Sequence, residues 1–465
     1  MAFLKKSKLW AAGIAIAMAL TAASVSGCAG GEGGGPETAP AETATQAITD
    51  TQSHDPVSID VWSFVNLPNE VQAMQDSMDR LQQKYPWLTV NLVNNKQDTD
   101  FTQAVTAGDA PDVFISWDPG SVAQFGINGS VIDMSALCAS AGLDVSATFP
   151  SSSLQYTQYN GKQYALPLLV DAYALYYNKD MFAAAGITDT PKTLSDLTAD
   201  IQKLTIKNPD GTIKQWGMTP PRSDYDVNSQ WFSGGATGVQ VYDANLQSTF
   251  STDPTWTEIL NWQKTVLDFY GKSNVDKFVA KYSDHTDDEQ NPFASGVSAM
   301  EMNGEWHIGE MDSLTKPINY GIVPVPVPDS KADIYGAGAV MGNVIYISSQ
   351  SQHQAEAFFV AQQLATDTQF VNDFATVMSN VPTTFDSLKT WDAPQTQPLW
   401  QVMMDIVSNP NSFYKALTPA GSEDLQPWTD FLSKWETGKV KPADLQAQLA
   451  QVDQQVATIN QQAQQ

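Results

Sequence analysis

From Val57 onward, strand-like and helix-like patterns of apolar residues alternate along the chain, and this alternation limits the folds that are open to it. Residues 57–62 alternate apolar and polar side chains, as a half-buried strand does. Residues 69–85 repeat apolar side chains at intervals of three and four, which predicts a helix with one apolar face. Because strands that alternate with helices are typical of α/β folds, we expect an α/β architecture with mainly parallel sheets.

The alternation continues along the rest of the chain. Further strands are expected at residues 88–93, 112–116, 171–179 and 343–348, and further helices at residues 98–109, 193–204 and 353–366. Gly108 fits the C-cap of the first of these helices, and Thr193 with Asp196 approximates a capping box at the start of the second. Residues 391–465 look helical throughout. A chain of 465 residues is long enough for two or three domains.

The charge balance excludes several classes of partner. The chain carries 51 acidic and 24 basic residues, a formal net charge of −27, and its only arginines are Arg80 and Arg222. Nucleic acids and anionic lipid headgroups are bound by clustered Lys and Arg side chains. We therefore expect no nucleic-acid partner and no adsorption to an anionic membrane surface.

Sequence motifs of cofactor and metal sites are missing. The sequence has no GxGxxG or GxxxxGK[ST] loop after a strand and no GxSxG elbow. The four histidines are scattered, without an HExxH pattern or a neighbouring cysteine pair. We therefore expect no cofactor and no metal site, and we expect Cys138 to be a small buried residue.

The N-terminus carries the pattern of an exported lipoprotein. Three lysines precede an uncharged apolar stretch at residues 9–25, and the tetrapeptide Val-Ser-Gly-Cys that ends at Cys28 resembles the bacterial lipobox. Residues 1–27 are therefore expected to be a signal peptide, and Cys28 is expected to carry a lipid. A plain signal peptide with a fortuitous cysteine and an uncleaved membrane anchor stay open as alternatives.

Residues 28–56 are expected to be a flexible tether. Gly, Pro, Ala, Thr and Glu dominate this stretch, so it has almost nothing to bury. A lipid at its start would hold the protein outside the cytoplasm at the cell membrane, within reach of a membrane partner.

Several segments in the body of the chain carry the motifs of a known family. They are TAGDAPDVFISWDPG, NGKQYALPLLVDAYALYYNKDMFAAAGI, FASGVSAMEMNGEWHIGEM, NYGIVPVPVPD and GNVIYISSQSQHQAEAFFVAQQLAT, followed by NVPTT. In this order they resemble the extracellular solute-binding proteins of sugar ABC transporters, the family that includes maltose-binding protein. The resemblance runs from about Val57 to the C-terminus.

The resemblance implies two α/β lobes, a hinge that the chain crosses more than once, and a ligand cleft between the lobes. Lobe 1 is expected at residues 57–169 and 339–383, and lobe 2 at residues 170–338 and 384–465. The family is not catalytic. The resemblance thus implies a monomeric binding protein that delivers a sugar to the permease subunits of an ABC transporter.

A neutral oligosaccharide needs flat aromatic surfaces for its CH-rich faces and polar side chains for its hydroxyls. By resemblance, Asp118 aligns with a sugar-binding aspartate, Asp171 takes the place of a ligand-binding glutamate, and Trp306 aligns with a stacking tryptophan. The full set of candidate ligand-binding residues is Phe64, Asn66, Trp117, Asp118, Asp171, Tyr173, Trp231, Asn303, Glu305 and Trp306.

Structural roles stay open for several candidates. Asp118 could stabilise a turn, and Asp171 could be a structural acid at the hinge. Core packing is an alternative for Trp231 and also for Trp62 and Trp428, two further aromatic residues. Glu305 takes a position that the family usually fills with a small residue or Pro, so its role is open.

Two other functions compete with sugar transport. A surface glycoside hydrolase would also combine aromatic platforms with paired carboxylates. A binding protein for peptides or for a phosphorylated ligand such as glycerol phosphate would need cationic side chains, for which Arg222 is a candidate.

Overall fold

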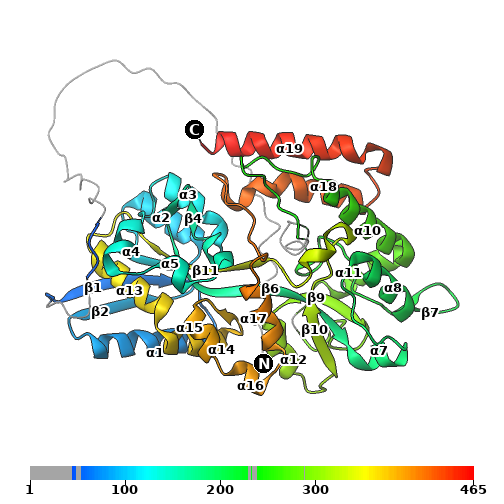
Figure 1. Cartoon of the computed structure of the whole chain (residues 1–465), viewed down its shortest axis with the longest axis horizontal. Coiled ribbons are helices and arrows are strands. Elements are labelled where there is room, and N and C mark those ends of the chain that lie inside the picture. The colour runs from blue at the N-terminus through cyan, green and yellow to red at the C-terminus, as the bar shows by residue number, and fades with distance from the viewer. Residues whose placement is uncertain (1–43, 49–53, 229–231, 233–237, 287, 465) are drawn as a thin grey trace, which may run out of the picture.

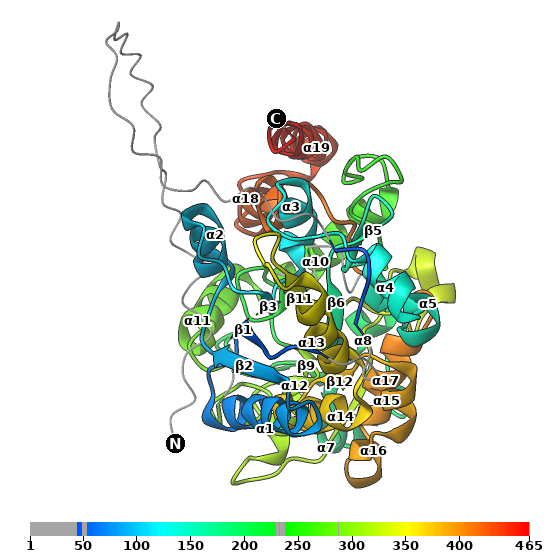
Figure 2. The ribbon, with the colours of Figure 1, turned by 90° about the vertical axis from the view of Figure 1, so that its left-hand side faces the viewer.

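The computed structural model of the chain describes residues 44–48, 54–228, 232, 238–286 and 288–464. Two α/β lobes lie side by side in Figure 1, and strand β6 (Leu166–Asn178) extends from one lobe into the other. Figure 2 shows α18 and α19 stacked at one end of the molecule, with α1 and α14 at the opposite end. The two-lobed α/β fold implied by the resemblance is thus confirmed.

The main sheet of the described residues has eight strands and is mixed. Strands β1, β2 and β3 are mutually parallel, whereas β11 runs antiparallel to β3 and β6, and β6 runs antiparallel to β9, β10 and β12. The bounds are β1 Val57–Ser63, β2 Leu88–Val93, β3 Val113–Ser116, β9 Met300–Gly304, β10 Tyr320–Pro324, β11 Val340–Ile347 and β12 Val381–Pro382. The expectation of mainly parallel sheets is wrong, because the chain enters the second lobe on β6 and returns beside it on β11 in the opposite direction.

Helices pack around each half of this sheet. Those around the first lobe are α1 Pro68–Lys84, α2 Asp98–Ala107, α3 Val122–Ile127, α4 Ser135–Ala141, α5 Val145–Thr148, α6 Ser151–Leu154, α13 Gln354–Thr366 and α14 Thr368–Met378. Three helices follow β12, namely α15 Phe385–Thr390, α16 Ala393–Thr396 and α17 Trp400–Ser408, and α17 packs against both β6 and β10. Those of the second lobe are α7 Lys179–Ala184, α8 Leu194–Leu204, α10 Pro254–Tyr270, α11 Lys272–Tyr282, α12 Trp306–Asp312, α18 Gln426–Glu436 and α19 Leu445–Gln462. Short hairpins join β4 (Gln158–Tyr159) to β5 (Lys162–Gln163) and β7 (Ile206–Lys207) to β8 (Ile213–Gln215).

Local sequence rules account for many of these boundaries. Gly108 ends α2 in the left-handed conformation, with φ of 76°, as its C-cap position predicts. Thr193 caps α8 and forms the predicted capping box with Asp196. Strand β6 is longer than the expected strand at 171–179, because Leu166 to Val170 are also buried and paired.

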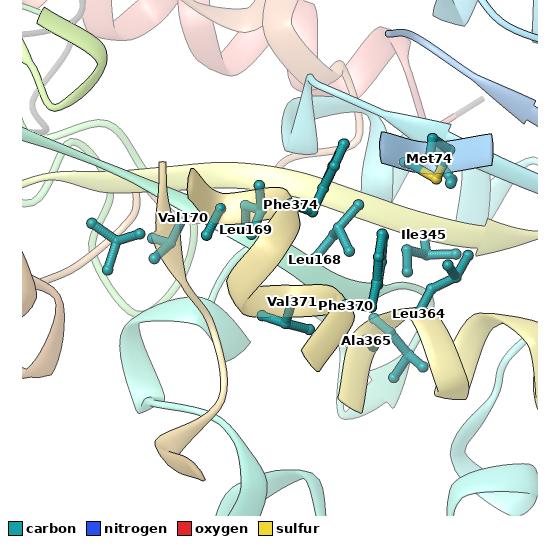
Figure 3. Close-up of a cluster of buried hydrophobic side chains, with 14 of the residues drawn as sticks. Met74, Leu168, Leu169, Val170, Ile345, Leu364, Ala365, Phe370, Val371 and Phe374 are labelled. Atoms are coloured by element: carbon teal, nitrogen blue, oxygen red, sulfur yellow. The ribbon is translucent and has the colours of Figure 1, made fainter. Parts of the chain in front are cut away.

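The first lobe buries both faces of its sheet. Figure 3 shows Phe370 and Phe374 of α14 packed beside Leu168 and Leu169 of β6. On the other face, Phe114 of β3 stacks on a phenylalanine of α2 with ring centroids 4.7 Å apart. Because adjacent residues of β3 point to opposite faces and both faces are covered, this strand is buried throughout.

The second lobe has a separate core that includes Trp428 of α18. Trp428 is fully buried and stacks on Phe250, with ring centroids 4.1 Å apart. Its Nε1–H donates a hydrogen bond to the Phe232 carbonyl at 2.6 Å. Trp428 is thus a core residue, which decides between the two roles that the sequence left open for it.

The C-terminal region is not helical throughout, contrary to the expectation for residues 391–465. Residues 409–420 form a non-helical segment between α17 and the short 3₁₀ helix η3 (Gly421–Leu425). Pro410 and Pro419 lie within this segment, and proline disfavours helix continuation. Phe413 donates its N–H to Gly338 and accepts one from Val340, so the segment lies along the start of β11.

Residues 44–48 contact the first lobe, although the sequence placed them in the tether. The Ala44 N–H donates to Gln354 Oε1 of α13 at 2.8 Å, and the Ala47 N–H donates to Ser140 Oγ of α4 at 2.8 Å. Ile48 packs, half-buried, against the first core.

We predict that Trp428→Ala lowers the free energy of unfolding by about 3–5 kcal/mol, because it removes a large side chain from a packed core. Phe385→Ala is the matched control, since Phe385 is 37% exposed and should cost less than about 1 kcal/mol. Urea unfolding followed by circular dichroism measures both. Equal losses for the two variants would contradict the core placement of Trp428.

Candidate ligand-binding site

Trp117 and Asp118 follow β3 and lie at its carboxyl end. Asp118 caps the 3₁₀ helix η1 (Pro119–Ser121), since its Oδ1 accepts the Gly120 N–H at 2.8 Å. Its Oδ2 accepts the hydroxyl of Ser422 in η3 at 2.9 Å, so Asp118 also connects the first lobe to the segment that precedes α18. Trp117 is half-buried and donates its Nε1–H to Gln97 Oε1 at 3.1 Å. The turn-stabilising role of Asp118 is therefore present, and its ligand contact stays a prediction.

Asp98 lies next to Asp118, although the sequence marked it only as the start of a helix. Ser116 at the end of β3 donates its hydroxyl to Asp98 Oδ1 at 2.5 Å. Burial, together with the Asp118 charge, raises the pKa of Asp98 to about 6. The two acids meet because the end of β3 and the start of α2 are adjacent in space, and no local pattern in the sequence shows this.

A second group of polar residues, Asp171, Glu305 and Asn380, is called here the crossing cluster. Asp171 lies on β6, Glu305 follows β9, and Asn380 lies between α14 and β12. The Asn380 amide nitrogen donates to Asp171 Oδ1 and also to Glu305 Oε1, the latter at 2.5 Å. The Ala172 N–H donates to Glu305 Oε2 at 2.7 Å. Glu305 is fully buried and Asp171 is half-buried, so only Asp171 is open to a ligand in this conformation.

Two aromatic rings lie beside the crossing cluster. Tyr173 and Trp306 meet edge to face, with ring centroids 5.9 Å apart and planes at 87°. Trp306 is half-buried, and its indole lies over Gly304, where an added Cβ would be 2.2 Å from the ring. Tyr173 is 5% exposed and contacts the sulfur of Met341 at 3.2 Å through its hydroxyl. The structure thus brings together Asp171, Tyr173 and Trp306.

Buried charges hold the Asn303–Trp306 segment in place. His307 Nε2 lies 2.7 Å from Glu301 Oε1, and Nδ1 lies 2.6 Å from Glu310 Oε2. Burial alone would lower the pKa of His307, but these two carboxylates raise it to about 10. Asn303 is 1% exposed and accepts the Gly304 N–H at 2.8 Å, so its observed contacts are structural.

Tyr414 interacts electrostatically with Asp118 and with Tyr173, and the sequence analysis missed it. It meets Tyr156 edge to face at 5.7 Å. Its pKa is raised by burial and by the Asp118 carboxylate, and it interacts electrostatically with Tyr173. A cavity of about 480 Å³ extends from Tyr414 along Gln155, Tyr159, Gln240 and Leu246.

The remaining candidates do not join these groups. Phe64 is 9% exposed and belongs to the first core, whereas Asn66 is exposed. Trp62 is half-buried, with Lys96 Nζ 4.2 Å above its ring. Trp231 and Cys28 lie outside the described residues. The ligand contacts of Phe64, Asn66 and Trp231 stay predictions.

Both arginines are engaged with carboxylates. Arg222 pairs with Asp224, with Asp276 at 3.4 Å and with the buried Glu436 at 3.3 Å. Arg80 lies 3.8 Å from Asp373 on the surface. Arg222 is therefore neutralised within the protein and is poorly placed to clamp a phosphate.

Three further features were considered among the described residues: a metal site, a membrane-spanning helix and a reactive thiol. In this part of the chain, no group of three or more His, Cys, Asp and Glu side chains is arranged to hold a metal ion. The same residues include no helix with the length and apolarity needed to cross a membrane. Cys138 is buried as expected, and burial raises the pKa of its thiol to about 12.

The sequence of this chain matches that of a known protein family. The sequence model described as bacterial extracellular solute-binding protein matches residues 66–369. The maltotriose-binding protein of Pyrococcus abyssi is 22% identical over 319 residues, which are 68% of this chain and 64% of that protein. A maltooligosaccharide ABC transporter solute-binding lipoprotein of Streptococcus pneumoniae is 25% identical over 280 residues, 57% of this chain and 58% of that protein. The chain thus spans less than two thirds of these relatives' length.

Comparison with solved structures supports the fold. The structure of the protein CpMnBP1 with mannotriose bound matches with a TM-score of 0.70 and 22% sequence identity. The match covers 86% of this chain and 100% of that chain. At this identity the likeness establishes the shared two-lobed fold.

We predict that the His307 ion pairs stabilise the protein in a pH-dependent manner. Because the folded pKa of about 10 exceeds the unfolded value of about 6.5, this stabilisation is fully present below pH 6.5 and is lost as the pH rises through 10. His307→Gln should therefore lower the free energy of unfolding by about 3–5 kcal/mol at pH 6, and by much less above pH 10.

Urea unfolding at both pH values measures this difference. His285→Gln is the control, since His285 pairs with Asp288 at the surface and should cost little at either pH. An equal loss for His307→Gln at pH 6 and above pH 10 would show that the imidazolium is not the stabilising species.

Proposed function

This chain belongs to the bacterial extracellular solute-binding proteins, and we propose that it captures a neutral di- or oligosaccharide between its two lobes for delivery to an ABC permease. The observation that carries the proposal is the group of Asp171, Tyr173 and Trp306 where β6 passes from one lobe to the other. An aromatic face beside a carboxylate suits a sugar ring, because the CH face packs on the indole while a hydroxyl donates to the acid.

Acids on the first lobe extend this site. Asp98 and Asp118 lie together at the end of β3. Tyr414 interacts electrostatically with Asp118 and with Tyr173. A ligand longer than one sugar ring would reach from Trp306 toward Trp117. The maltotriose and maltooligosaccharide named for two relatives, and the mannotriose named for the solved structure, support a ligand of this class.

The charges around the site favour a neutral ligand. Asp98, Asp118 and Asp171 are acids near the site, and the positive charge of His307 is balanced by Glu301 and Glu310. Both arginines of the chain are also paired with acids. A phosphorylated ligand such as glycerol phosphate would be repelled by these carboxylates, since like charges at short range cost free energy.

Hydrolysis of the sugar is disfavoured by the crossing cluster. A glycoside hydrolase needs two carboxyl groups on either side of the scissile bond. Here Glu305 is fully buried, and its two oxygens accept hydrogen bonds from Asn380 and from Ala172. It therefore cannot face a glycosidic bond beside Asp171, and the relatives named above are binding proteins.

The lobe boundaries and the membrane anchor are parts of the proposal. The first crossing is kept near Val170 in β6 and the second at residues 338–340. The third is kept near Thr383, after β12, since α17 beyond it packs against β6 and against β10 of the second lobe. A lipid on Cys28 would anchor a monomeric protein at the outer face of the cell membrane, and a relative named as a lipoprotein supports this.

We expect a panel of neutral sugars that includes maltotriose and mannotriose to contain a ligand that raises the melting temperature. A ligand at a hundredfold excess over its Kd adds about 2.7 kcal/mol to the free energy of unfolding. Glycerol phosphate is the negative control. Steady conversion of the bound sugar into smaller products would contradict the binding function.

Asp171→Ala should weaken binding of that sugar by roughly 1.5–3 kcal/mol, or about 10- to 150-fold, because it removes a charged hydrogen-bond acceptor. Gly304→Ala should also weaken it, because the added Cβ displaces the Trp306 ring. Asp386→Ala, on the exposed face of α15, is the control. Isothermal titration calorimetry gives the affinities, and an unchanged Kd for Asp171→Ala would leave only a structural role for this acid.

Cys28→Ser should release the protein from the membrane fraction in soluble form, since it removes the proposed lipid attachment. Fractionation of cells that express each form measures this. Retention of the substituted protein in the membrane fraction would support an uncleaved anchor instead.

A further inference from the structure

The crossing cluster lies where three parts of the chain meet. On β6, Ala172 pairs with Val340 of β11, and the next residue, Tyr173, pairs with Gly304 of β9. Figure 1 shows β6 continuing through this point from the first lobe into the second. A change in the cluster therefore affects both the ligand site and the junction of the lobes.

Two carboxyl groups share one amide nitrogen in this cluster. Asn380 Nδ2 donates to an oxygen of Asp171 and to an oxygen of Glu305. Since two hydrogen bonds meet at one atom, the two oxygens lie within about 6 Å of each other. Two full negative charges at this separation, with one of them fully buried, would repel each other strongly.

Among the residues that the structure describes, the groups around Glu305 do not supply a free positive charge to offset that repulsion. The side chains that interact with it from β6 are Asp171, Tyr173 and Tyr176, and the pKa values of both tyrosines are raised by burial and by nearby carboxylates. Asp226 adds a further negative charge near Tyr173. His307 of α12 is already held between Glu301 and Glu310.

Of the two carboxyl groups, Glu305 is therefore the one that is protonated and neutral. Burial raises its pKa well above the ordinary value, and Asp171 raises it further, against the lowering effect of the Ala172 N–H. A protonated Glu305 can donate to Asp171, while Asn380 holds the same Asp171 carboxylate from the first lobe.

We propose that neutral Glu305, together with Asn380, is a positioning residue that fixes the Asp171 carboxylate toward the ligand, so that loss of the Glu305 proton at higher pH weakens ligand binding. This inference rests on the proposed function, because it takes Asp171 as a ligand contact. Ionisation of Glu305 places a second charge beside Asp171 and turns a donor into an acceptor. The ligand affinity should then decrease as the pH rises, by up to tenfold per pH unit above the Glu305 pKa.

The test is the affinity of the tightest-binding neutral sugar of the panel, measured by calorimetry from pH 5.5 to pH 10. In the unsubstituted protein the Kd should rise at high pH. In Glu305→Gln the rise between pH 7 and pH 9 should be absent, because the amide keeps a donor and never ionises. This range lies above the pKa of Asp98, about 6, and below that of His307, about 10. Glu305→Ala should bind more weakly than Glu305→Gln at low pH, because Asn380 and the Ala172 N–H lose their acceptor.

Glu436→Gln is the matched control. Glu436 is another buried carboxyl, with a pKa raised to about 7 by burial, but it lies against Ser223 and α10 of the second lobe. This variant should keep the pH profile of the unsubstituted protein. A flat profile in the unsubstituted protein, or an unchanged profile in Glu305→Gln, would overturn the proposal.

A measurement without ligand separates this proposal from the proposed function. The infrared difference spectrum between the unsubstituted protein and Glu305→Gln at pH 7 should contain the carbonyl band of one protonated carboxyl, because the bands of Asp98 and Glu436 are common to both proteins and cancel. If no sugar of the panel binds at any pH, the proposed function fails, and this band still reports the charge of Glu305. Absence of this band from the difference spectrum would overturn the inference by itself.

Discussion

The continuity of strand β6 is the constraint on which the rest of the structure depends. Its 13 residues pair with β11 and β12 at one end and with β9 and β10 at the other, so one strand belongs to both lobes. A break in it would leave buried backbone groups without partners, which is costly. The lobes are therefore joined along this strand, and Asp171 and Tyr173 lie where its partners change. The candidate site follows from that topology rather than from any single loop.

Acid-rich surroundings impose a second constraint on the same place. The chain has a formal net charge of −27, and several carboxyl groups lie near the site. Each is accommodated differently. Asp98 accepts a hydrogen bond from the hydroxyl of Ser116, and Asp118 caps η1. Within the crossing cluster, burial raises the pKa of Glu305. The acids that a sugar would contact thus have their geometry fixed by donors of the protein, and this preorganisation lowers the cost of binding.

Much of the fold could be predicted because it follows local rules. Apolar periodicity gave α1 and β2 nearly to their ends, and a left-handed glycine ended α2 at the expected place. The strand directions could not be predicted, since β6 and β11 are far apart in sequence and their pairing is tertiary. The same limit applies to the site. Asp171 and Trp306 were found through family motifs. Asn380, which contacts Asp171, and Tyr414, which interacts electrostatically with Tyr173, reach the site only because distant segments meet there.

A crystal structure of the protein with its tightest-binding neutral sugar tests the central claim most directly. The account predicts one sugar ring packed on the Trp306 indole, a sugar hydroxyl within hydrogen-bond distance of the Asp171 carboxylate, and contacts from both lobes to the same ligand. A sugar held by one lobe alone, with Asp171 still enclosed by protein groups, would contradict it.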